Sequence, residues 1–329
     1  MTISRRTVIS GLAATPALAL RMPRAFAAGY PERPIHLIVP FAAGGNADIV
    51  GRLVGDAMGK VLGGTVVVEN RGGAGGSVGA EIVARATPDG YMLLVASNGP
   101  MTVNPFVQAH LAYDPLKDFA PVALTSYVPH ALIMSNKAGV SSIADVIALS
   151  KKAPVTIASS GVGSATHMTL ERFKHATGAN ITHVPYRSGG ALMPDLMSGA
   201  VQGAMTELST ALPLHQGGQA KIIAIASMHR SKLAADIPTF DESGVKGFVA
   251  QSYIGIVAPV KTPPDIVTKL TQAVAKGLAA GGPAAEKLVS LGSELATPEQ
   301  LTADGFAGFL RTDTENMREA AKLAGIVPQ

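Results

Sequence analysis

The chain has 329 residues, more than one typical domain, and 47% of them are hydrophobic but only 5% aromatic, with no Trp. Its cores must therefore be built from Ala, Val, Leu, Ile and Met. The formal net charge is +4, and the absence of Cys excludes disulfides, thiolate metal sites and a cysteine nucleophile.

The first 27 residues have the features of an export signal. The pair Arg5-Arg6 precedes an apolar stretch from Val8 to Leu20, and Ala25-Phe26-Ala27 has the small-x-small pattern of a signal peptidase site. The stretch is shorter than the ~20 residues of a membrane span. We predict that residues 1–27 are a twin-arginine-type signal peptide and that the mature protein is periplasmic. Export by the general secretory route and a cytosolic chain with a basic tail are the alternatives.

Cleavage after Ala27 would change the charge of the protein. The removed segment holds Arg5, Arg6, Arg21 and Arg24 and no acid, so 23 of the 27 basic residues would remain against 23 acidic ones. A net charge of zero gives no support for binding to polyanions. We therefore predict no nucleic-acid partner.

The first third of the predicted mature chain alternates strands and helices. Ile35–Val39 is a short apolar run, and the apolar residues of the next segment recur at helical spacing. This β-α-β-α-β order is typical of a parallel sheet covered by helices. The predicted elements are a strand at Ile35–Val39, a helix at Ala47–Leu62, a strand at Val66–Val68, a helix at Val78–Ala86 and a strand at Tyr91–Ala96.

The same alternation starts again after Ser141, which predicts a second α/β lobe. Two apolar stretches, Val122–Met134 and Phe248–Ala258, are the predicted crossings between the lobes. Ala- and Leu-rich helices after Pro263 are expected to pack on the first lobe. We predict lobe 1 from residues 28–126 plus 252–329 and lobe 2 from residues 127–251. The second-lobe elements are helices at Ser141–Lys151, Thr166–Thr177, Ala191–Ser198 and Ser209–Gln216, and strands at Val155–Ala158, Ile181–Val184, Val201–Met205 and Lys221–Ala226.

Two glycine-rich turns occupy matching places in the two halves. Val39–Asp48 and Ser159–His167 each follow an apolar strand and open a helix. The first N–H groups of a helix lack backbone partners and lie at its positive end, so such a turn favours an anion. A third turn, His183–Gly190, adds Tyr186 and Arg187, and an arginine can donate two hydrogen bonds to a carboxylate. These turns indicate binding of a small carboxylate rather than catalysis.

Three side chains near these turns permit two interpretations each. Asp48 either complements the helix dipole or braces the loop and pairs with an ammonium group of a ligand, and Arg52 is placed to pair with it at (i, i+4). His167 either donates a hydrogen bond to the backbone or contacts a ligand. Arg187 either faces solvent or binds a carboxylate.

Three catalytic or cofactor patterns are weak. Gly75-Gly76-Ser77-Val78-Gly79 matches the G-x-S-x-G elbow of serine hydrolases, but the preceding strand ends well before Ser77. An exported serine hydrolase that uses Ser77 is kept as the alternative function. Gly73, Gly75 and Gly79 lack the spacing and the following acid of a dinucleotide site. The scattered histidines have no metal-ligand spacing, so we predict no metal and no cofactor.

Several strings together resemble the periplasmic solute receptors of tripartite tricarboxylate transporters, the Bug receptors. The resemblance spans nearly the whole mature chain and implies no enzymatic activity. It implies an α/β, two-lobe Venus-flytrap fold with parallel-rich sheets flanked by helices and two crossover strands. The strings include Tyr30–Ile35, Val39-Pro40-Phe41, Gly44-Gly45-x-x-Asp48, Val67–Arg71, Pro88–Tyr91, Tyr113–Val122, Gly163-Ser164-x-x-His167-Met168 and His183–Tyr186.

The resemblance also implies a site and partners. A small organic acid or related ligand is expected in the cleft, held by loops of both lobes and bridging waters, in a monomer that serves transporter membrane subunits or a sensor kinase. Gln202 and Met205 stand where Asp and Phe are usual, and Glu207 follows close behind; if Glu207 faces the cleft, it favours a ligand with an amine or amide. Tyr253 stands where a tryptophan is frequent. The predicted ligand-binding residues are Phe41, Ala42, Gly44, Gly45, Asn46, Asp48, Ser97, Ser159, Gly163, Ser164, His167, Tyr186, Arg187, Thr206 and Tyr253.

Overall fold

The computed structural model describes residues 29–323 and residue 328. The predicted signal peptide, residues 1–27, lies outside the described residues. Within the described part of the chain, no helix is long and apolar enough to cross a membrane.

Three parallel strands form the sheet of the first lobe. The central strand β1 (Ile35–Val39) pairs with β2 (Val66–Asn70) on one side and β3 (Met92–Ser97) on the other. Helices α1 (Asn46–Leu62) and α2 (Ser77–Ala84) connect them. Gly63 ends α1 in the left-handed conformation, with φ 68°, and donates its N–H to Gly59 O. These elements agree with the predicted ones to within about two residues at each end.

The second lobe repeats this arrangement farther along the chain. Its strand β5 (Val155–Ser159) pairs in parallel with β6 (Ile181–Pro185) and β7 (Gly203–Glu207). The remaining elements of this lobe are η3 (Asn136–Ala138), α4 (Ile143–Ser150), α5 (Ala165–Thr177), α6 (Met193–Ser198), α7 (Leu208–Gln216) and β8 (Ala220–Ile225).

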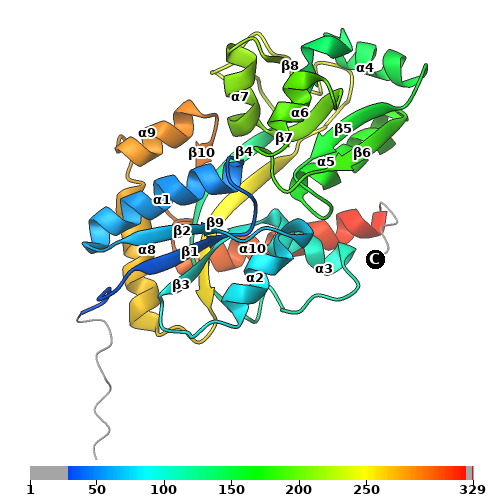
Figure 1. The fold of residues 1–329 in the computed structure, drawn as a ribbon. Coiled ribbons are helices and arrows are strands. Elements are labelled where there is room, and N and C mark those ends of the chain that lie inside the picture. Colours follow the sequence, from blue (N-terminus) through cyan, green and yellow to red (C-terminus); the bar gives the residue numbers. More distant parts are fainter. Residues whose placement is uncertain (1–28, 324–327, 329) are drawn as a thin grey trace, which may run out of the picture.

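Two long strands join the lobes. β4 (Phe119–Ser135) and β9 (Gln251–Pro259) run antiparallel and pass through the middle of the molecule, as Figure 1 shows. β3 pairs with β9, and the far half of β4 pairs with β7 and β8. The strand order is β2-β1-β3-β9-β4-β7-β5-β6. The two predicted crossings are thus the two central strands of one continuous sheet.

The C-terminal part of the chain returns to the first lobe, as predicted. Pro263 and Pro264 stand at the start of α8 (Pro264–Gly277), where proline is tolerated, and α8 packs against α1. A short strand β10 (Glu294–Leu295) pairs with β4, and α10 (Ala303–Leu323) packs along β4. The remaining elements are η1 (Ala74–Gly76), η2 (Gly99–Val103), α3 (Asn104–Val107) and α9 (Pro283–Ser290).

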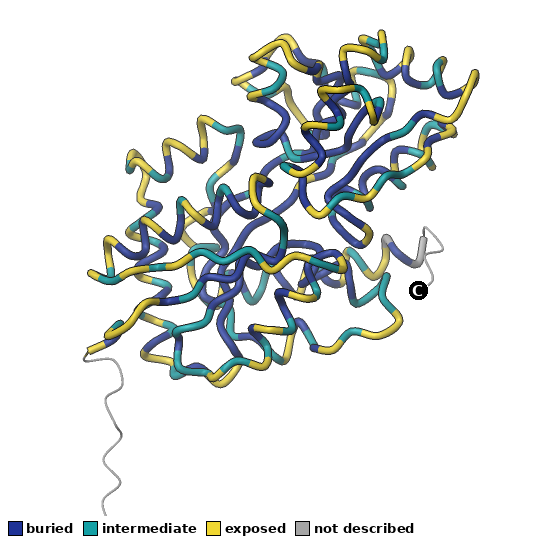
Figure 2. Tube along the Cα trace, in the orientation of Figure 1, coloured by how far each residue is buried: buried dark blue, intermediate teal, exposed yellow. Residues whose placement is uncertain are grey.

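Each lobe has its own apolar interior. In the first lobe Leu37, Val54 and Ile256 are fully buried together, and in the second Ile157, Leu170 and Phe173 are. Figure 2 shows the buried chain concentrated along the sheet and the exposed chain on the outer helices and loops. The two halves have separate cores and are connected by two strands, and the space between such halves is a common place for a ligand.

Candidate ligand-binding cleft

A small cavity of ≈ 30 Å³ lies between the two lobes, within a region of ≈ 400 Å³ of non-atom space that includes open solvent. Its walls come from the predicted loops, the ends of β3 and β7, and the start of β9. The residues that line it are Phe41, Gly45, Asn46, Ala47, Ser97, Asn98, Gly99, Ser160, Ser164, Ala165, Ser188, Gly189, Glu207, Ser252 and Ile254. Residues of both lobes therefore contribute to the lining.

Two helices begin at this cavity. α1 starts at Asn46 after Gly45, and α5 starts at Ala165 after Ser164. Ser164 caps α5, because its Oγ accepts a hydrogen bond from His167 N at 3.1 Å. The positive ends of two helices, one from each lobe, therefore meet the same small space and favour an anion there.

Two hydroxyl groups in the cavity wall have no hydrogen-bond partner. Ser97 and Ser160 are 6% and 7% exposed, and their Oγ atoms are buried without a partner. A buried hydroxyl without a partner costs stability, so both groups require water or a ligand as partner. They lie on opposite lobes, at the ends of β3 and β5.

The first-lobe loop is fixed by the buried carboxylate of Asp48. Its Oδ2 accepts from Gly44 N at 3.0 Å, and its Oδ1 accepts from Asn70 Nδ2 at 2.9 Å and lies 2.8 Å from Arg52 Nη2. Burial alone would raise the pKa of Asp48, but the bonds from Arg52, Gly44 and Asn70 hold it below its usual value. Asp48 thus braces the loop, which is one of its two interpretations. The (i, i+4) pair with Arg52 is also formed.

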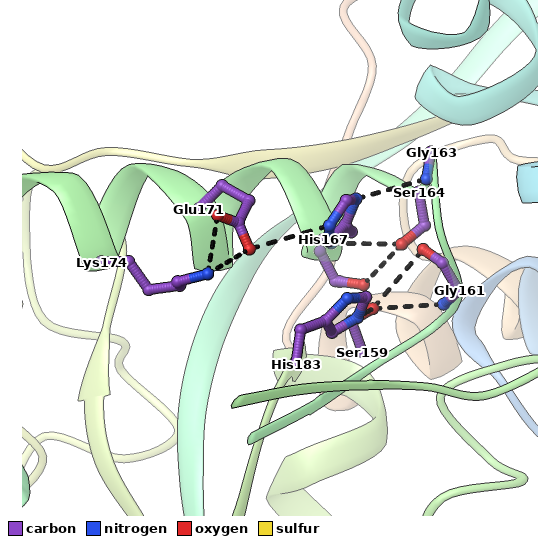
Figure 3. A network of polar contacts seen from close by, with 9 residues as sticks. Ser159, Gly161, Gly163, Ser164, His167, Glu171, Lys174 and His183 are labelled. Carbon is purple, nitrogen blue, oxygen red and sulfur yellow. Dashed lines mark hydrogen bonds and ion pairs between the residues drawn. The ribbon is translucent and has the colours of Figure 1, made fainter. Parts of the chain in front are cut away.

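The second-lobe loop is held by two stacked imidazoles, shown in Figure 3. The rings of His167 and His183 lie 4.3 Å apart at 20°. His167 Nδ1 accepts from Gly163 N at 3.3 Å, and His183 Nε2 is 2.7 Å from Ser159 Oγ. Burial lowers the pKa of both histidines, that of His183 to about 4. His167 is therefore bonded to the backbone, but as the acceptor of the hydrogen bond and not as the predicted donor.

The glycine-rich loops of the two lobes touch each other directly. Ala42 N donates to Arg187 O at 3.2 Å, and Ser188 Oγ donates to Ala43 O at 3.4 Å. A Cβ on Gly190 would overlap the backbone of Gly44, so the close approach requires glycine. A further bond joins the lobes where Ser209 Oγ donates to Asn46 Oδ1 at 2.8 Å.

The structure brings only part of the predicted site to the cavity wall. Phe41, Gly45, Asn46, Ser97 and Ser164 line it. A second group supports the wall from behind or connects the lobes through the contacts above, and consists of Ala42, Gly44, Asp48, Gly163 and His167.

Three predicted positions are displaced by one residue from those that line the cavity. Ser159 bonds to His183, and Ser160 faces the cavity instead. Thr206 is fully buried, and Glu207 faces the cavity. Tyr253 points to the opposite face of β9, into a core with Phe306 and Phe309, and Ser252 and Ile254 face the cavity. Successive side chains of a strand point to opposite faces, which accounts for the displacement at Tyr253.

Two residues of the third turn do not line the cavity in this arrangement. Tyr186 donates its hydroxyl hydrogen to Asp195 Oδ2 at 2.5 Å, and Arg187 is exposed. Their backbone neighbours Ser188 and Gly189 line it instead. The sequence prediction also missed Asn98 and Gly99, since the helical turns η2 and α3 were not expected after β3. Asn98 Oδ1 accepts from Tyr253 N at 3.0 Å and so connects this segment to β9.

The geometry around Ser77 does not support the hydrolase alternative. Ser77 is the first residue of α2. Its Oγ donates to Gln108 Oε1 at 2.9 Å and accepts from Asn104 Nδ2 at 2.8 Å. Among its described partners there is no histidine, so no general base is in reach. Across residues 29–323, no group of three or more His, Asp or Glu is arranged to hold a metal ion.

The fold and the interlobe cavity define a periplasmic solute-binding protein. The family model described as tripartite tricarboxylate transporter family receptor matches residues 50–307. The chain belongs to this receptor family.

Solved structures of similar chains have the same fold. The periplasmic binding protein BugD is 34% identical, with a TM-score of 0.87 over 91% of this chain and 100% of that chain. Rpa4515 of R. palustris, solved with adipate, is 31% identical, with a TM-score of 0.86 over 91% of this chain and all of its own. MatC of Rhodopseudomonas palustris, solved with malate, is 30% identical, with a TM-score of 0.84 over 89% of this chain and all of its own. The matched proteins are solute-binding receptors rather than enzymes.

Proposed function

We propose that the protein captures a small carboxylate-containing molecule between its lobes and delivers it for uptake. The observation that supports this most directly is the meeting of the α1 and α5 N-termini at one cavity with the unpartnered hydroxyls of Ser97 and Ser160. A carboxylate there would accept from first-turn N–H groups and from both hydroxyls. The adipate and malate bound by two similar chains support the same ligand class.

The contacts proposed for the ligand come from both lobes. Asn46, Ala47 and Ser97 would act from the first lobe, and Ser160, Ser164 and Ala165 from the second. The proposed site leaves out Tyr253, Tyr186 and Thr206, whose side chains have other partners. Bridging waters would satisfy polar groups that a small ligand does not reach.

Thermal unfolding with a panel of mono-, di- and tricarboxylates tests this proposal. A ligand at ~100 times its Kd adds about 2.7 kcal/mol to the free energy of unfolding, which corresponds to a rise in Tm on the order of 5 °C or more. A selective rise for one compound is the expected result. If protein shown to be ligand-free by native mass spectrometry responds to no carboxylate, the proposal fails.

We also propose that the lobes, residues 28–126 plus 252–329 and residues 127–251, close about β4 and β9. Near both boundaries Tyr127 pairs with Tyr253 and Val128 with Ser252. Closure of this kind is stabilised by a ligand only through contacts that exist in the closed state. Small-angle scattering should therefore give a smaller radius of gyration with ligand than without it.

Export and assembly are part of the same proposal. The pair Arg5-Arg6 and the apolar stretch after it support the twin-arginine route. We propose that the protein is a monomer and that transporter membrane subunits bind its closed form. A sensor kinase is the other type of partner that we propose. Light scattering and co-purification with each partner would check these points.

A further inference from the structure

The described cavity wall carries a negative side chain and no positive one. Among the described residues that line the cavity, Glu207 is the one acidic or basic side chain. The wall contains neither Arg nor Lys to balance it. A ligand therefore meets one negative side chain together with the two positive helix ends.

The Glu207 carboxylate has only neutral partners. It stands at the end of β7, where Oε1 accepts from Ser252 Oγ at 3.2 Å and Oε2 accepts from Thr206 Oγ1 at 3.3 Å. In the described part of the chain it belongs to none of the ion pairs. A Cβ on Gly189 would lie 3.3 Å from Oε2, so the glycine keeps this oxygen reachable from the cavity.

The residues behind Glu207 supply no positive charge either. Ser252 Oγ lies 2.8 Å from His130 Nε2, and His130 Nδ1 lies 2.8 Å from Thr169 Oγ1. His130 is fully buried, and burial lowers its pKa to about 3, so it is neutral at physiological pH. Burial correspondingly raises the pKa of Glu207. Glu207 is half-buried, and a carboxylate withdrawn from water without a counter-ion costs stability unless a partner supplies the positive charge.

The cavity thus has two poles. The N-termini of α1 and α5 and the hydroxyls of Ser97 and Ser160 favour a negative group, and Glu207 with Ser252 favours a hydrogen-bond donor with positive charge. A plain dicarboxylate would satisfy the first pole and place its other charge against Glu207. A molecule with both a carboxylate and an ammonium group satisfies both poles.

We propose that the physiological ligand is a small amino acid or a related ammonium carboxylate, and that Glu207 is the residue that selects its ammonium group. This inference rests on the proposed function, because it assumes that the cleft binds a carboxylate. Glu207 and Ser252 would each accept one hydrogen bond from the ligand ammonium group, and the orientation of the ligand would follow from the separation of the two poles.

Calorimetric titration with matched ligand pairs tests the proposal. The pairs are aspartate and succinate, glutamate and glutarate, and 4-aminobutyrate and butyrate, each differing by one amine. We expect the wild-type protein to bind the amine-bearing member of the best pair at least ~10-fold more tightly, a ratio typical of a desolvated ion pair. In Glu207→Gln this ratio should fall to near one, with binding of the plain carboxylate unchanged or tighter.

Two further variants make the result unambiguous. Glu286→Gln removes an exposed carboxylate on α9 and should retain the wild-type ratio. Glu207→Asp retains the charge and should keep a preference for the amine with weaker binding. If the wild-type protein prefers the plain carboxylates, or if Glu207→Gln leaves the ratio unchanged, this inference is overturned and the proposed function stands. If no carboxylate of either kind binds, the proposed function itself fails.

Discussion

The two loops that approach the cleft are held in place by different chemistry. In the first lobe a buried carboxylate, Asp48, collects three donors and fixes the turn before α1. In the second lobe two neutral imidazoles, His167 and His183, stack beneath the turn before α5. Both arrangements present a helix N-terminus to the same cavity, but one depends on a charge and the other on its absence. The contacts that hold the two loops should therefore be lost under different conditions.

The largest expected effect is the loss of the first-lobe brace. Asp48→Ala leaves Gly44 N, Asn70 and Arg52 without their shared acceptor, and hydrogen bonds to a charged group contribute roughly 1.5–3 kcal/mol each. We expect a fall of about 2–3 kcal/mol in the free energy of unfolding, measured by urea denaturation, and weaker ligand binding. Asp56→Ala, on the exposed side of the same helix, is the control. Equal losses in the two variants would contradict the bracing role.

The contact between the loops is the next test. Gly190→Ala introduces a methyl group that overlaps Gly44 only when the lobes are closed. We expect ligand affinity to fall about tenfold or more, equivalent to at least ~1.4 kcal/mol, with little change in the stability of each lobe. Gly308→Ala, whose added Cβ has its nearest neighbour at 3.9 Å, should bind as the wild type does. Unchanged affinity in Gly190→Ala would show that closure does not need this approach.

The pH dependence separates the two braces. The pKa of His183 in the folded protein, about 4, lies below the unfolded value near 6.5, so its contribution to stability is present above pH ~6.5 and is lost as the pH falls towards 4. His167 and the buried His130 shift in the same direction. The pKa of Asp48 is lowered from a value near 4, so the first-lobe brace is lost only below that pH.

His183→Gln should reduce this loss between pH 6.5 and 4. The glutamine amide keeps a hydrogen-bonding group near Ser159 but does not titrate, so Tm should fall less steeply with acid than in the wild type. His229→Gln, at an exposed position, is the control. Identical Tm profiles of His183→Gln and the wild type over this range would show that His183 does not contribute to acid sensitivity.

The smallest expected effect concerns the cavity wall between the two loops. The pKa of Glu207 is raised by burial, so its stabilising contribution is present below the unfolded pKa and is lost as the pH rises through the folded value. At pH 7.5 its charge is therefore a cost to the empty protein. Glu207→Gln should raise Tm by a few degrees at pH 7.5, since about 1 kcal/mol corresponds to roughly 2–4 °C. Near pH 4 the difference should vanish, and a lower Tm at pH 7.5 would contradict this account.

The order of the elements follows well from the sequence, and the direction of single side chains does not. Ile35–Val39 is predicted at its observed bounds because apolar runs and glycine stops are local signals. Whether Ser252 or Tyr253 faces the cavity depends on the register of β9. That register is set by pairing with β4, more than 120 residues earlier in the chain. The segment Gly99–Val107 was missed because its helical turns are short and contain Pro100 and Pro105.

The position of Ser252 and Ile254 on β9 has a mechanical consequence. Both side chains belong to a strand that passes through the middle of the molecule, close to the axis about which we propose the lobes rotate. Points near an axis of rotation travel least, so this floor of the cavity keeps its shape while the two glycine-rich loops swing apart. A solute should therefore contact first the part of the wall formed by Ser252 and Ile254, which is the same before and after closure. The two glycine-rich loops would then come together over the bound solute.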